Sequence, residues 1–386
     1  MKMKILFVGT DFNRSGAALA MIELANNIKN IGNEVFVVFP GYGEAVNEAK
    51  RRGLNCSIIR SYEWVKPIRR KEKIQTKIKW VLKHLYNTVS IVRLSRFIVK
   101  NNIEIVHINT LWGYVGAIAA KMTHRPYVWH MRELLEQQDL KIRWEKIGSK
   151  LINSASALIA ISEVVKKNYE PKFNSELIKM IYDGIDIDSQ ILNDREIFVS
   201  DQIRIMVAGG VRPHKRQFDI IKAAHVLDLM GIQFHISIVG DDNTEYASLI
   251  KDYIEQNHLS SNITFIGEVS NIYDHWNKND VAITAAENEA FGRVTVEGML
   301  AGCVTVASNS GASKEIIEDR KTGYLYAVGD YEGIANIIAE IFRDKTKAKT
   351  IADLGQKSVR ERFDSLVNAK KINALYYDII NDLPEG

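Results

Sequence analysis

Apolar runs of strand length alternate with segments of helical period along nearly all of this 386-residue chain. Runs rich in Val, Ile and Leu are typical of strands buried on both faces, and a strand followed by a helix indicates a parallel sheet covered by helices. The first half has a helical pattern over Ala17–Ile31 and strand candidates at Lys4–Val8, Val35–Phe39, Cys56–Arg60, Ile103–Ile108, Tyr127–His130 and Ala157–Ile161. The sequence therefore predicts an α/β unit at the N-terminal end.

The same pattern then starts again, which indicates a second α/β unit. Its strand candidates are Ile203–Ala208, Phe234–Val239, Ile263–Ile266, Val281–Thr284 and Cys303–Ala307, and helical patterns close the chain at Tyr331–Arg343, Thr346–Phe363 and Ser365–Ile380. We expect two Rossmann-like, doubly wound domains, residues 1–185 and 186–364, with the helix of 365–386 returning to the first. Ligands of such sheets bind at the carboxyl ends of the strands, so facing domains would hold them in a central cleft.

The most informative segment runs from Ala286 to Gly302, after the strand candidate Val281–Thr284. Glu289 falls in the loop, Phe291 and Gly292 fall at the start of the next helix, and Glu297 lies inside that helix. Free N–H groups at a helix start favour a phosphate, and glycine lets a ligand approach the backbone closely. Ionised carboxylates only accept hydrogen bonds, which suits sugar hydroxyls. The alternative is that both glutamates are helix caps or solvated charges.

This segment resembles the E-x7-E signature of the retaining GT-B glycosyltransferases of family 4. Glu289, Phe291, Gly292, Glu297 and Gly302 match the pattern, whereas Ala290 replaces its usual Gly and Gly298 its usual Ala. The resemblance implies that Glu289 contacts the hydroxyls of a donor sugar and Glu297 those of a ribose. The backbone around Ala290, Phe291, Gly292, Arg293 and Val294 would then hold a diphosphate.

Further segments resemble the donor half of the same family. The turn Gly209-Gly210 precedes Lys215, the counterpart of a phosphate-binding lysine, and Gly240 follows the next strand. Gly210 stands where many members carry Arg, so Arg212 is our substitute for the missing guanidinium. Glu268 and Val269 match a segment whose backbone receives the nucleobase. The alternative for Lys215 is a solvated lysine at a helix start.

The first half resembles the acceptor domain of the family more loosely. Gly16 matches one glycine of a loop after the first strand, and this loop would approach the donor; a plain helix-start turn is the alternative. His130 ends a strand where the family often has a histidine facing the reacting sugar. A histidine that faces the core is the alternative. Asn109, Arg132 and Glu133 are candidates for acceptor contacts.

Positive charge is concentrated in residues 60–100. Twelve Lys and Arg stand there against Glu63 and Glu72, a net charge of +10, whereas the whole chain carries +4. Apolar residues recur at helical spacing from Ile74 to Val92, with Trp64 and Trp80 in the same segment. Such a helix suits an anionic membrane surface. The alternative is a core-facing helix with a solvated basic face, and nucleic acid is not an expected partner because no binding module accompanies the helix.

The resemblance implies an enzyme that moves a sugar from a nucleoside diphosphate to an acceptor hydroxyl with retained configuration and without a metal. His130, Glu289 and Lys215 would be its catalytic residues. We expect a hexosyl- or N-acetylhexosaminyltransferase of cell-envelope polysaccharide or glycolipid synthesis, acting on a lipid-linked glycan. No secretory signal, membrane-spanning run or metal-ligand cluster is evident, so we expect a cytoplasmic protein, peripheral on the inner membrane face. A sugar-nucleotide epimerase or a phosphorylase would share the fold, and an inactive carbohydrate-binding relative is a third alternative.

Overall fold

The computed structural model describes residues 2–69, 73–187 and 195–382, and the chain divides into two compact units. Unit 1 comprises Met1–Gly184 together with the C-terminal segment from Ser365, and unit 2 comprises Ile185–Asp364. The division after Gly184 lies one residue from the expected boundary. Residues 70–72 of the basic segment lie outside the described residues.

The described part of unit 1 contains a parallel sheet of seven strands in the order β3-β2-β1-β5-β6-β8-β9. Its strands are β1 (Lys4–Val8), β2 (Glu34–Phe39), β3 (Asn55–Ile58), β5 (Ile105–Asn109), β6 (Tyr127–Met131), β8 (Ala157–Ala160) and β9 (Ile178–Met180). Two three-residue strands, β4 (Val65–Pro67) and β7 (Leu140–Ile142), pair antiparallel beside it. These two and β9 were not expected, because three residues are too few to show a period.

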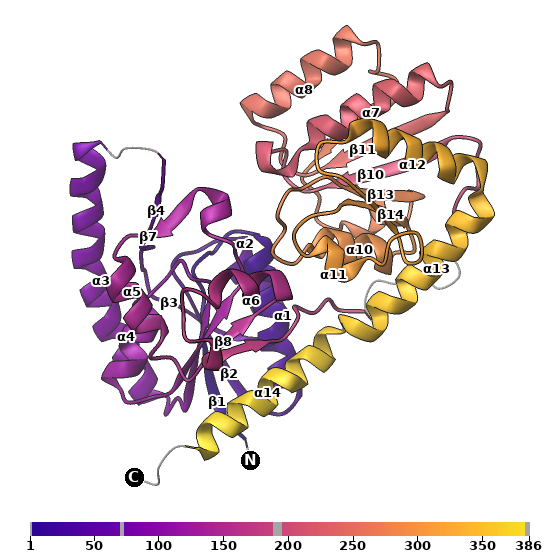
Figure 1. The fold of residues 1–386 in the computed structure, drawn as a ribbon. Coiled ribbons are helices and arrows are strands. Elements are labelled where there is room, and N and C mark those ends of the chain that lie inside the picture. The colour runs from indigo at the N-terminus through magenta and orange to yellow at the C-terminus, as the bar shows by residue number, and fades with distance from the viewer. Residues whose placement is uncertain (1, 70–72, 188–194, 383–386) are drawn as a thin grey trace. The chain divides into compact units, whose positions relative to one another are not determined.

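Helices cover both faces of this sheet (Figure 1). They are α1 (Gly16–Asn30), α2 (Glu44–Arg51), α3 (Ile74–Lys100), α4 (Val115–Met122), α5 (Glu145–Ile152), α6 (Glu163–Tyr169) and α14 (Ser365–Asn381). Helix α14 packs on α1, and its Ala369, Ile372 and Tyr376 join the core formed by β1 and α1. The last helix of the chain is therefore part of the first unit.

Unit 2 repeats the architecture, with a described sheet of six parallel strands in the order β12-β11-β10-β13-β14-β15. The strands are β10 (Ile203–Ala208), β11 (Phe234–Val239), β12 (Ile263–Gly267), β13 (Val281–Thr284), β14 (Val304–Ser308) and β15 (Tyr324–Tyr326). Its helices are α7 (Gln217–Leu229), α8 (Glu245–Gln256), α9 (Tyr273–Trp276), α10 (Arg293–Leu300), α11 (Ser313–Ile316), α12 (Tyr331–Arg343) and α13 (Lys345–Arg362).

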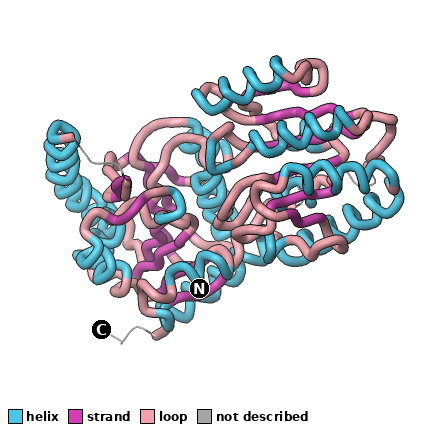
Figure 2. Tube along the Cα trace, turned by 45° about the horizontal axis from the view of Figure 1, so that its top comes forward, coloured by secondary structure: helices cyan, strands magenta, loops and turns pink. Residues whose placement is uncertain are grey.

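Alternating side chains of β10 supply the two cores of unit 2. Ile205 and Val207 pack with α7, α8 and α12, whereas Met206 between them packs with Trp276 and Cys303 on the other face. Successive strand residues point to opposite faces, so a strand covered on both sides is apolar throughout. Figure 2 shows the strands of each unit between helices. The predicted α/β fold of two Rossmann-like halves is confirmed.

None of the helices among the described residues is long and apolar enough to span a bilayer.

Candidate functional site

The carboxyl ends of β10, β11, β13 and β14 bring four loops of unit 2 to one edge of its sheet. Strand β10 lies between β11 and β13. The chain therefore continues from β10 to β11 and β12 on one side, and adds β13 and the later strands on the other side of β10. Such a switch point is where ligands of open α/β sheets bind. The loops are the turn after Ala208, the turn after Val239, the segment from Ala285 to Gly292 and the turn after Ser308.

Lys215 and Glu289 form an ion pair at this edge, between the Lys215 ammonium and Glu289 Oε1. Lys215 ends a short 3-10 helix, Pro213–Lys215, whereas Glu289 lies in the loop before α10. The two loops are joined directly, because Glu287 N–H donates to the carbonyl oxygen of His214 at 3.2 Å. Both charged side chains stay partly exposed, at 29% and 20%. They are therefore held in place and still reachable by a ligand.

The turn after β14 fixes the backbone of Glu289. Ala312 N–H donates to the carbonyl oxygen of Glu289 at 2.9 Å, and Asn288 N–H donates to Ser310 Oγ at 3.1 Å. Gly311 has a φ of +53°, and a Cβ atom there would lie 2.5 Å from the nitrogen and oxygen of Glu289. A side chain at position 311 would displace the Glu289 loop, so the glycine is required by this close approach.

Helix α10 starts at this edge, and its first turn contains no acidic side chain. Gly292, with a φ of +84°, precedes the helix, and Phe291 is buried against Phe363 with ring centroids 5.4 Å apart. Glu297 is 8% exposed and lies 3.6 Å from Arg293 Nε through its Oε1 atom. The helix start can accept an anion, and a carboxylate follows one turn later.

Two glycines form the neighbouring turns of β10 and β11. Gly240 has a φ of +141°, and a Cβ atom there would lie 2.5 Å from the carbonyl of Gly209. Gly209 itself has a φ of +115° but open space around its Cβ position. Gly240 is thus needed for backbone packing, while Gly209 is needed for its conformation and leaves room for a ligand.

Arg212 is engaged by Asp241, which weakens its expected role. Its Nη2 atom lies 2.5 Å from Asp241 Oδ2, and Nη1 donates to the carbonyl oxygen of Val211 at 2.9 Å. The hydrogen bond from Arg212 lowers the pKa of the Asp241 carboxyl. Arg212 would have to leave Asp241 to reach a phosphate, so its role as the substitute for an Arg at position 210 stays a prediction.

The remaining expected donor residues of unit 2 lie around the same edge. Glu268 is exposed just after β12, and Val269 and Val294 pack partly against the core cluster that holds Met206. Gly210 is half-buried, and its carbonyl oxygen accepts from Gln217 Nε2 at 3.0 Å. Gly16 belongs to unit 1, where it is the first residue of α1.

In unit 1, His130 lies in a buried cluster with Arg132, Asn109 and Asp183. Arg132 donates from Nε to Asn109 Oδ1 at 2.7 Å and from Nη1 to Asp183 Oδ1. Its Nη2 atom lies 3.2 Å from His130 Nδ1, and His130 Nε2 lies 3.8 Å from Asp183 Oδ1. His130 is only 1% exposed, which agrees with the core-facing alternative for its ring.

Arg132 determines which ring nitrogen atoms of His130 and His107 carry a proton. A guanidinium only donates, so His130 Nδ1 accepts, and the His107 Nε2 atom 3.1 Å away must then carry a proton. His107 Nδ1 accepts in turn from the Tyr376 hydroxyl of α14 at 2.6 Å. Burial, followed by the charge of Arg132, lowers the pKa of both histidines well below the usual value. Both shifts favour neutral rings, and these hydrogen bonds assign the proton of His130 to Nε2, which lies 3.8 Å from Asp183 Oδ1.

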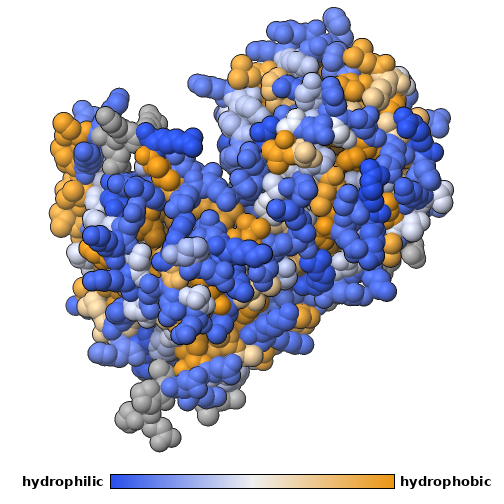
Figure 3. Space-filling view, viewed as in Figure 1, coloured by the Kyte–Doolittle hydropathy of each residue, from blue (hydrophilic) through white to orange (hydrophobic). Residues whose placement is uncertain are grey.

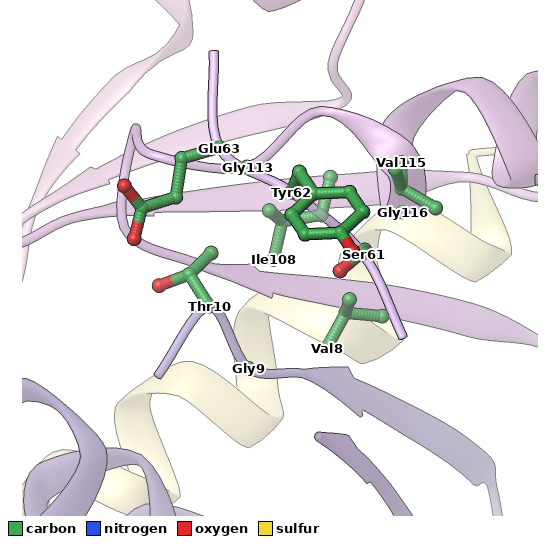
Figure 4. Close-up of a pocket in the computed structure, with 10 residues that line it drawn as sticks. All are labelled: Val8, Gly9, Thr10, Ser61, Tyr62, Glu63, Ile108, Gly113, Val115 and Gly116. Atoms are coloured by element: carbon green, nitrogen blue, oxygen red, sulfur yellow. The ribbon is translucent and has the colours of Figure 1, made fainter. Parts of the chain in front are cut away.

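A pocket lies at the carboxyl ends of β1 and β5, the switch point of the unit 1 sheet (Figure 4). Figure 4 shows the Thr10 hydroxyl and the Glu63 carboxylate beside one another, with the Tyr62 ring opposite. The Thr10 hydroxyl lies 2.8 Å from that of Thr110. The arrangement offers hydroxyl and carboxylate groups to a polar ligand.

Two family models match this chain and together span residues 14–358. The description of the first, over residues 189–358, is glycosyl transferases group 1, and that of the second, over residues 14–189, is glycosyltransferase family 4. Each model falls on one of the α/β halves. The chain belongs to the group 1 and family 4 type of GT-B glycosyltransferases.

Curated relatives are identical to this glycosyltransferase at about a quarter of the positions in the aligned segments. N-acetyl-alpha-D-glucosaminyl L-malate synthase of Bacillus anthracis is 24% identical over 242 residues, which are 61% of this chain and 63% of that protein. The capsular polysaccharide biosynthesis glycosyltransferase CapM of Staphylococcus aureus is 22% identical over 292 residues, 70% of this chain and 75% of that one. The match thus spans less than two thirds of the Bacillus relative.

Solved structures share the fold of the glycosyltransferase over almost its full length. The HepE protein of Anabaena in complex with UDP and glucose has a TM-score of 0.81 at 23% identity, covering 99% of this chain and all of that one. A glycosyltransferase from Rickettsia africae gives a TM-score of 0.80 at 20% identity, covering 99% and 100%. At these identities the likeness shows the GT-B fold.

The structure argues against the expectation that Glu133 contacts the acceptor of the glycosyltransferase. It is buried, and its two carboxylate oxygens accept the backbone N–H groups of Leu111 and Arg132. Burial raises its pKa to about 8, against the effect of these hydrogen bonds. We assign this side chain to holding the loops after β5 and β6. Asn109 and Arg132 are likewise buried and engaged with one another.

Several residues of these sites, among them Asp183, Tyr376 and Glu63, were not identified as participants from the sequence. Asp183 lies 51 positions from its partner Arg132, and Tyr376 lies 269 positions from its partner His107, so no local pattern connects either pair. Glu63 was counted only as a charge within the basic segment. The sequence signal that could have identified Glu63 is its position shortly after the carboxyl end of β3, where ligands of such sheets bind.

Proposed function

We propose that this protein transfers a sugar from a nucleoside diphosphate sugar to an acceptor hydroxyl, with retained configuration, in the synthesis of a cell-envelope glycan. The observation that carries this proposal is the Lys215–Glu289 ion pair beside the start of α10, with Glu297 one turn inside. Support also comes from relatives named for capsular polysaccharide and lipopolysaccharide core biosynthesis, and from HepE structures with UDP and UDP-glucose.

The chemistry follows from the charge that develops on the leaving group. When the bond between the sugar and the diphosphate breaks, negative charge grows on the diphosphate. The Lys215 ammonium and the N–H groups at the start of α10 would stabilise it, and such preorganised groups are usually a large catalytic term. Glu289 holds Lys215 in place and offers its other carboxylate oxygen to sugar hydroxyls. Glu297 would accept hydrogen bonds from the ribose.

The acceptor belongs to unit 1 in this proposal. The pocket of Thr10, Tyr62 and Glu63 supplies half-buried hydroxyl groups and an exposed carboxylate, whereas Arg132 and Asn109 bind one another. We therefore place acceptor hydroxyls in this pocket, and propose a hexose or N-acetylhexosamine as the transferred sugar. His130 would act through a proton on Nε2, because His107 and Arg132 both donate to its Nδ1 atom.

Equilibrium binding of a nucleoside diphosphate tests the donor site. Replacing Glu297 by Gln removes its charge at nearly constant volume, so it should weaken UDP or another preferred diphosphate by about 1–3 kcal/mol, roughly tenfold to a hundredfold. The exposed Glu245→Gln on α8 is the matched control and should bind as the wild type does. Calorimetry measures both. Unchanged affinity in Glu297→Gln would remove Glu297 from the donor site.

A further inference from the structure

Helix α3 attaches to unit 1 through polar side chains along its middle. His84 Nδ1 lies 2.6 Å from the Tyr114 hydroxyl, and Asn87 exchanges hydrogen bonds of 2.9 and 2.8 Å with the backbone of Tyr62. Ser90 donates to the carbonyl oxygen of Arg60. Only the last part of the helix buries apolar residues. The inward face of α3 is therefore polar along the middle of the helix, where an ordinary surface helix is apolar.

The outward face of α3 is apolar over the whole length of the helix. At 100° per residue its large apolar side chains fall within an arc of about 100°. Their exposed fractions run from 42% to 75%. We call these residues the α3 stripe: Ile74, Ile78, Val81, Leu82, Leu85, Val89, Val92 and Val99. Figure 3 shows hydrophobic surface along the outer edge of unit 1, where α3 runs in Figure 1. The alternative that these residues face the core is wrong, and the buried apolar residues of α3 are only Ile91, Leu94 and Ile98.

The charges around the α3 stripe are all positive. Helix α3 contains no Asp or Glu, and its cationic side chains are exposed. They are Lys77, Lys79, Lys83, Arg93, Arg96 and Lys100. On the helical wheel Arg96 falls within the stripe, and Arg93 and Lys100 fall along its edge. An apolar band with a cationic border matches the boundary between lipid headgroups and acyl chains.

We propose that the α3 stripe docks on an anionic membrane surface, with the stripe inserted between the headgroups and the flanking cations bound to lipid phosphates. The helix lies in the plane of the interface along its 27 residues, about 40 Å. This inference goes beyond the proposed transfer reaction and does not depend on it. It supplies the physical means by which such an enzyme reaches a lipid-borne acceptor.

Charge argues against a second copy of the chain as the occupant. Two α3 helices packed along their stripes would bring Lys and Arg of both copies together with no acidic partner on either helix. Helix pairs in solution are usually stabilised by opposite charges on either side of their apolar interface, and like charges at these positions destabilise them. Anionic lipids complement the same surface without this repulsion.

Vesicle co-sedimentation tests the proposal with the full-length protein. Vesicles of phosphatidylglycerol and phosphatidylcholine are compared with pure phosphatidylcholine, at about 0.1 M and about 1 M salt, where the screening length falls from ~10 Å to ~3 Å. We expect the wild type to bind the anionic vesicles and to lose most of this binding at high salt. Each Lys or Arg near an anionic surface strengthens partitioning about fivefold.

Two variants separate the apolar and the ionic contributions. The stripe variant carries Ile78→Ser, Leu85→Ser and Val89→Ser, and the charge variant carries Lys77→Ser, Arg93→Ser and Arg96→Ser. All six side chains are exposed, so both variants should keep the wild-type Tm. Both should lower partitioning by roughly a hundredfold. The control, Leu229→Ser with Leu249→Ser, removes two exposed apolar residues of unit 2 and should bind as the wild type does.

Three results would overturn the proposal. They are failure of the wild type to bind anionic vesicles, equal binding to neutral vesicles, and unchanged binding in the stripe variant. Sedimentation velocity completes the test. A wild-type dimer that the stripe variant converts to a monomer would assign the stripe to a second copy of this chain.

Discussion

At the scale of single residues, Lys215 and Arg212 are two cations on one turn with different partners. Lys215 pairs with Glu289, which the resemblance places at the donor sugar, whereas Arg212 pairs with Asp241. The sequence placed both cations beside the glycine turn but could not distinguish them, since each partner comes from a distant loop. Contacts across loops are set by the fold and leave no local pattern.

This difference predicts unequal effects of two substitutions. Lys215→Ala should lower kcat by about a hundredfold or more while changing nucleoside diphosphate affinity less, because charge grows on the diphosphate only during the reaction. Arg212→Ala should lower kcat far less than Lys215→Ala does, because it removes only a contact within the turn. Steady-state kinetics and calorimetry on both variants measure the effects. Equal, small losses in kcat would reject the phosphate role of Lys215.

The neutral histidines of unit 1 predict a pH dependence of stability. Burial lowers the pKa of His107 and His130 well below about 6.5, the value in the unfolded chain. Protons therefore bind only to the unfolded chain as the pH falls below about 6.5. The free energy of unfolding is highest above this pH and should decrease below it, by up to about 1.4 kcal/mol per pH unit for each histidine.

Denaturant unfolding at about pH 7.5 and about pH 5.5 measures this dependence. In His107→Gln the decrease should be smaller by up to about 1.4 kcal/mol per pH unit, because one titrating group is gone. His258→Asn, at an exposed position with a φ of +57°, is the control and should keep the wild-type slope. An unchanged slope in His107→Gln would mean that His107 is not held neutral by the fold.

At the scale of elements, periodicity predicted the long strands and helices well. The bounds of β1, β10, β11, β13 and α12 agree with the expected ones, because each is an unbroken apolar run or a strong 3.6-residue pattern. The same reasoning did not predict the three-residue strands β4, β7, β9 and β15. A three-residue strand depends on a partner elsewhere in the chain, and its own sequence carries too few positions to show a period.

Helix α3 shows the limit of periodicity most clearly. Its pattern predicts an amphipathic helix but does not say which face turns inward. The orientation depends on His84, Asn87 and Ser90, whose partners lie in the Arg60–Tyr62 segment and at Tyr114. These hydrogen bonds attach the helix to unit 1 through its polar side and leave the α3 stripe exposed.

At the scale of the whole molecule, the two units repeat one architecture and place their sites in the same way. In unit 2 the Lys215–Glu289 pair lies at the carboxyl ends of the strands around β10, and in unit 1 the Thr10 and Glu63 pocket lies at those of β1 and β5. The sequence placed the unit 2 candidates at this edge of the sheet, because the motif residues follow strands directly; their donor role stays a prediction. It missed the pocket of unit 1, whose residues come from three separate loops.

Turnover of nucleoside diphosphate sugars, with and without an acceptor, tests the central claim most directly. A panel of donors is incubated with the purified protein and an extract of envelope glycolipids, and released nucleoside diphosphate and sugar anomers are measured. Our account predicts diphosphate release that the acceptor accelerates, sugar joined to the acceptor with retained configuration, and little release by Lys215→Ala. Donor conversion that ignores the acceptor, conversion that needs inorganic phosphate instead, or no turnover of any donor would contradict it.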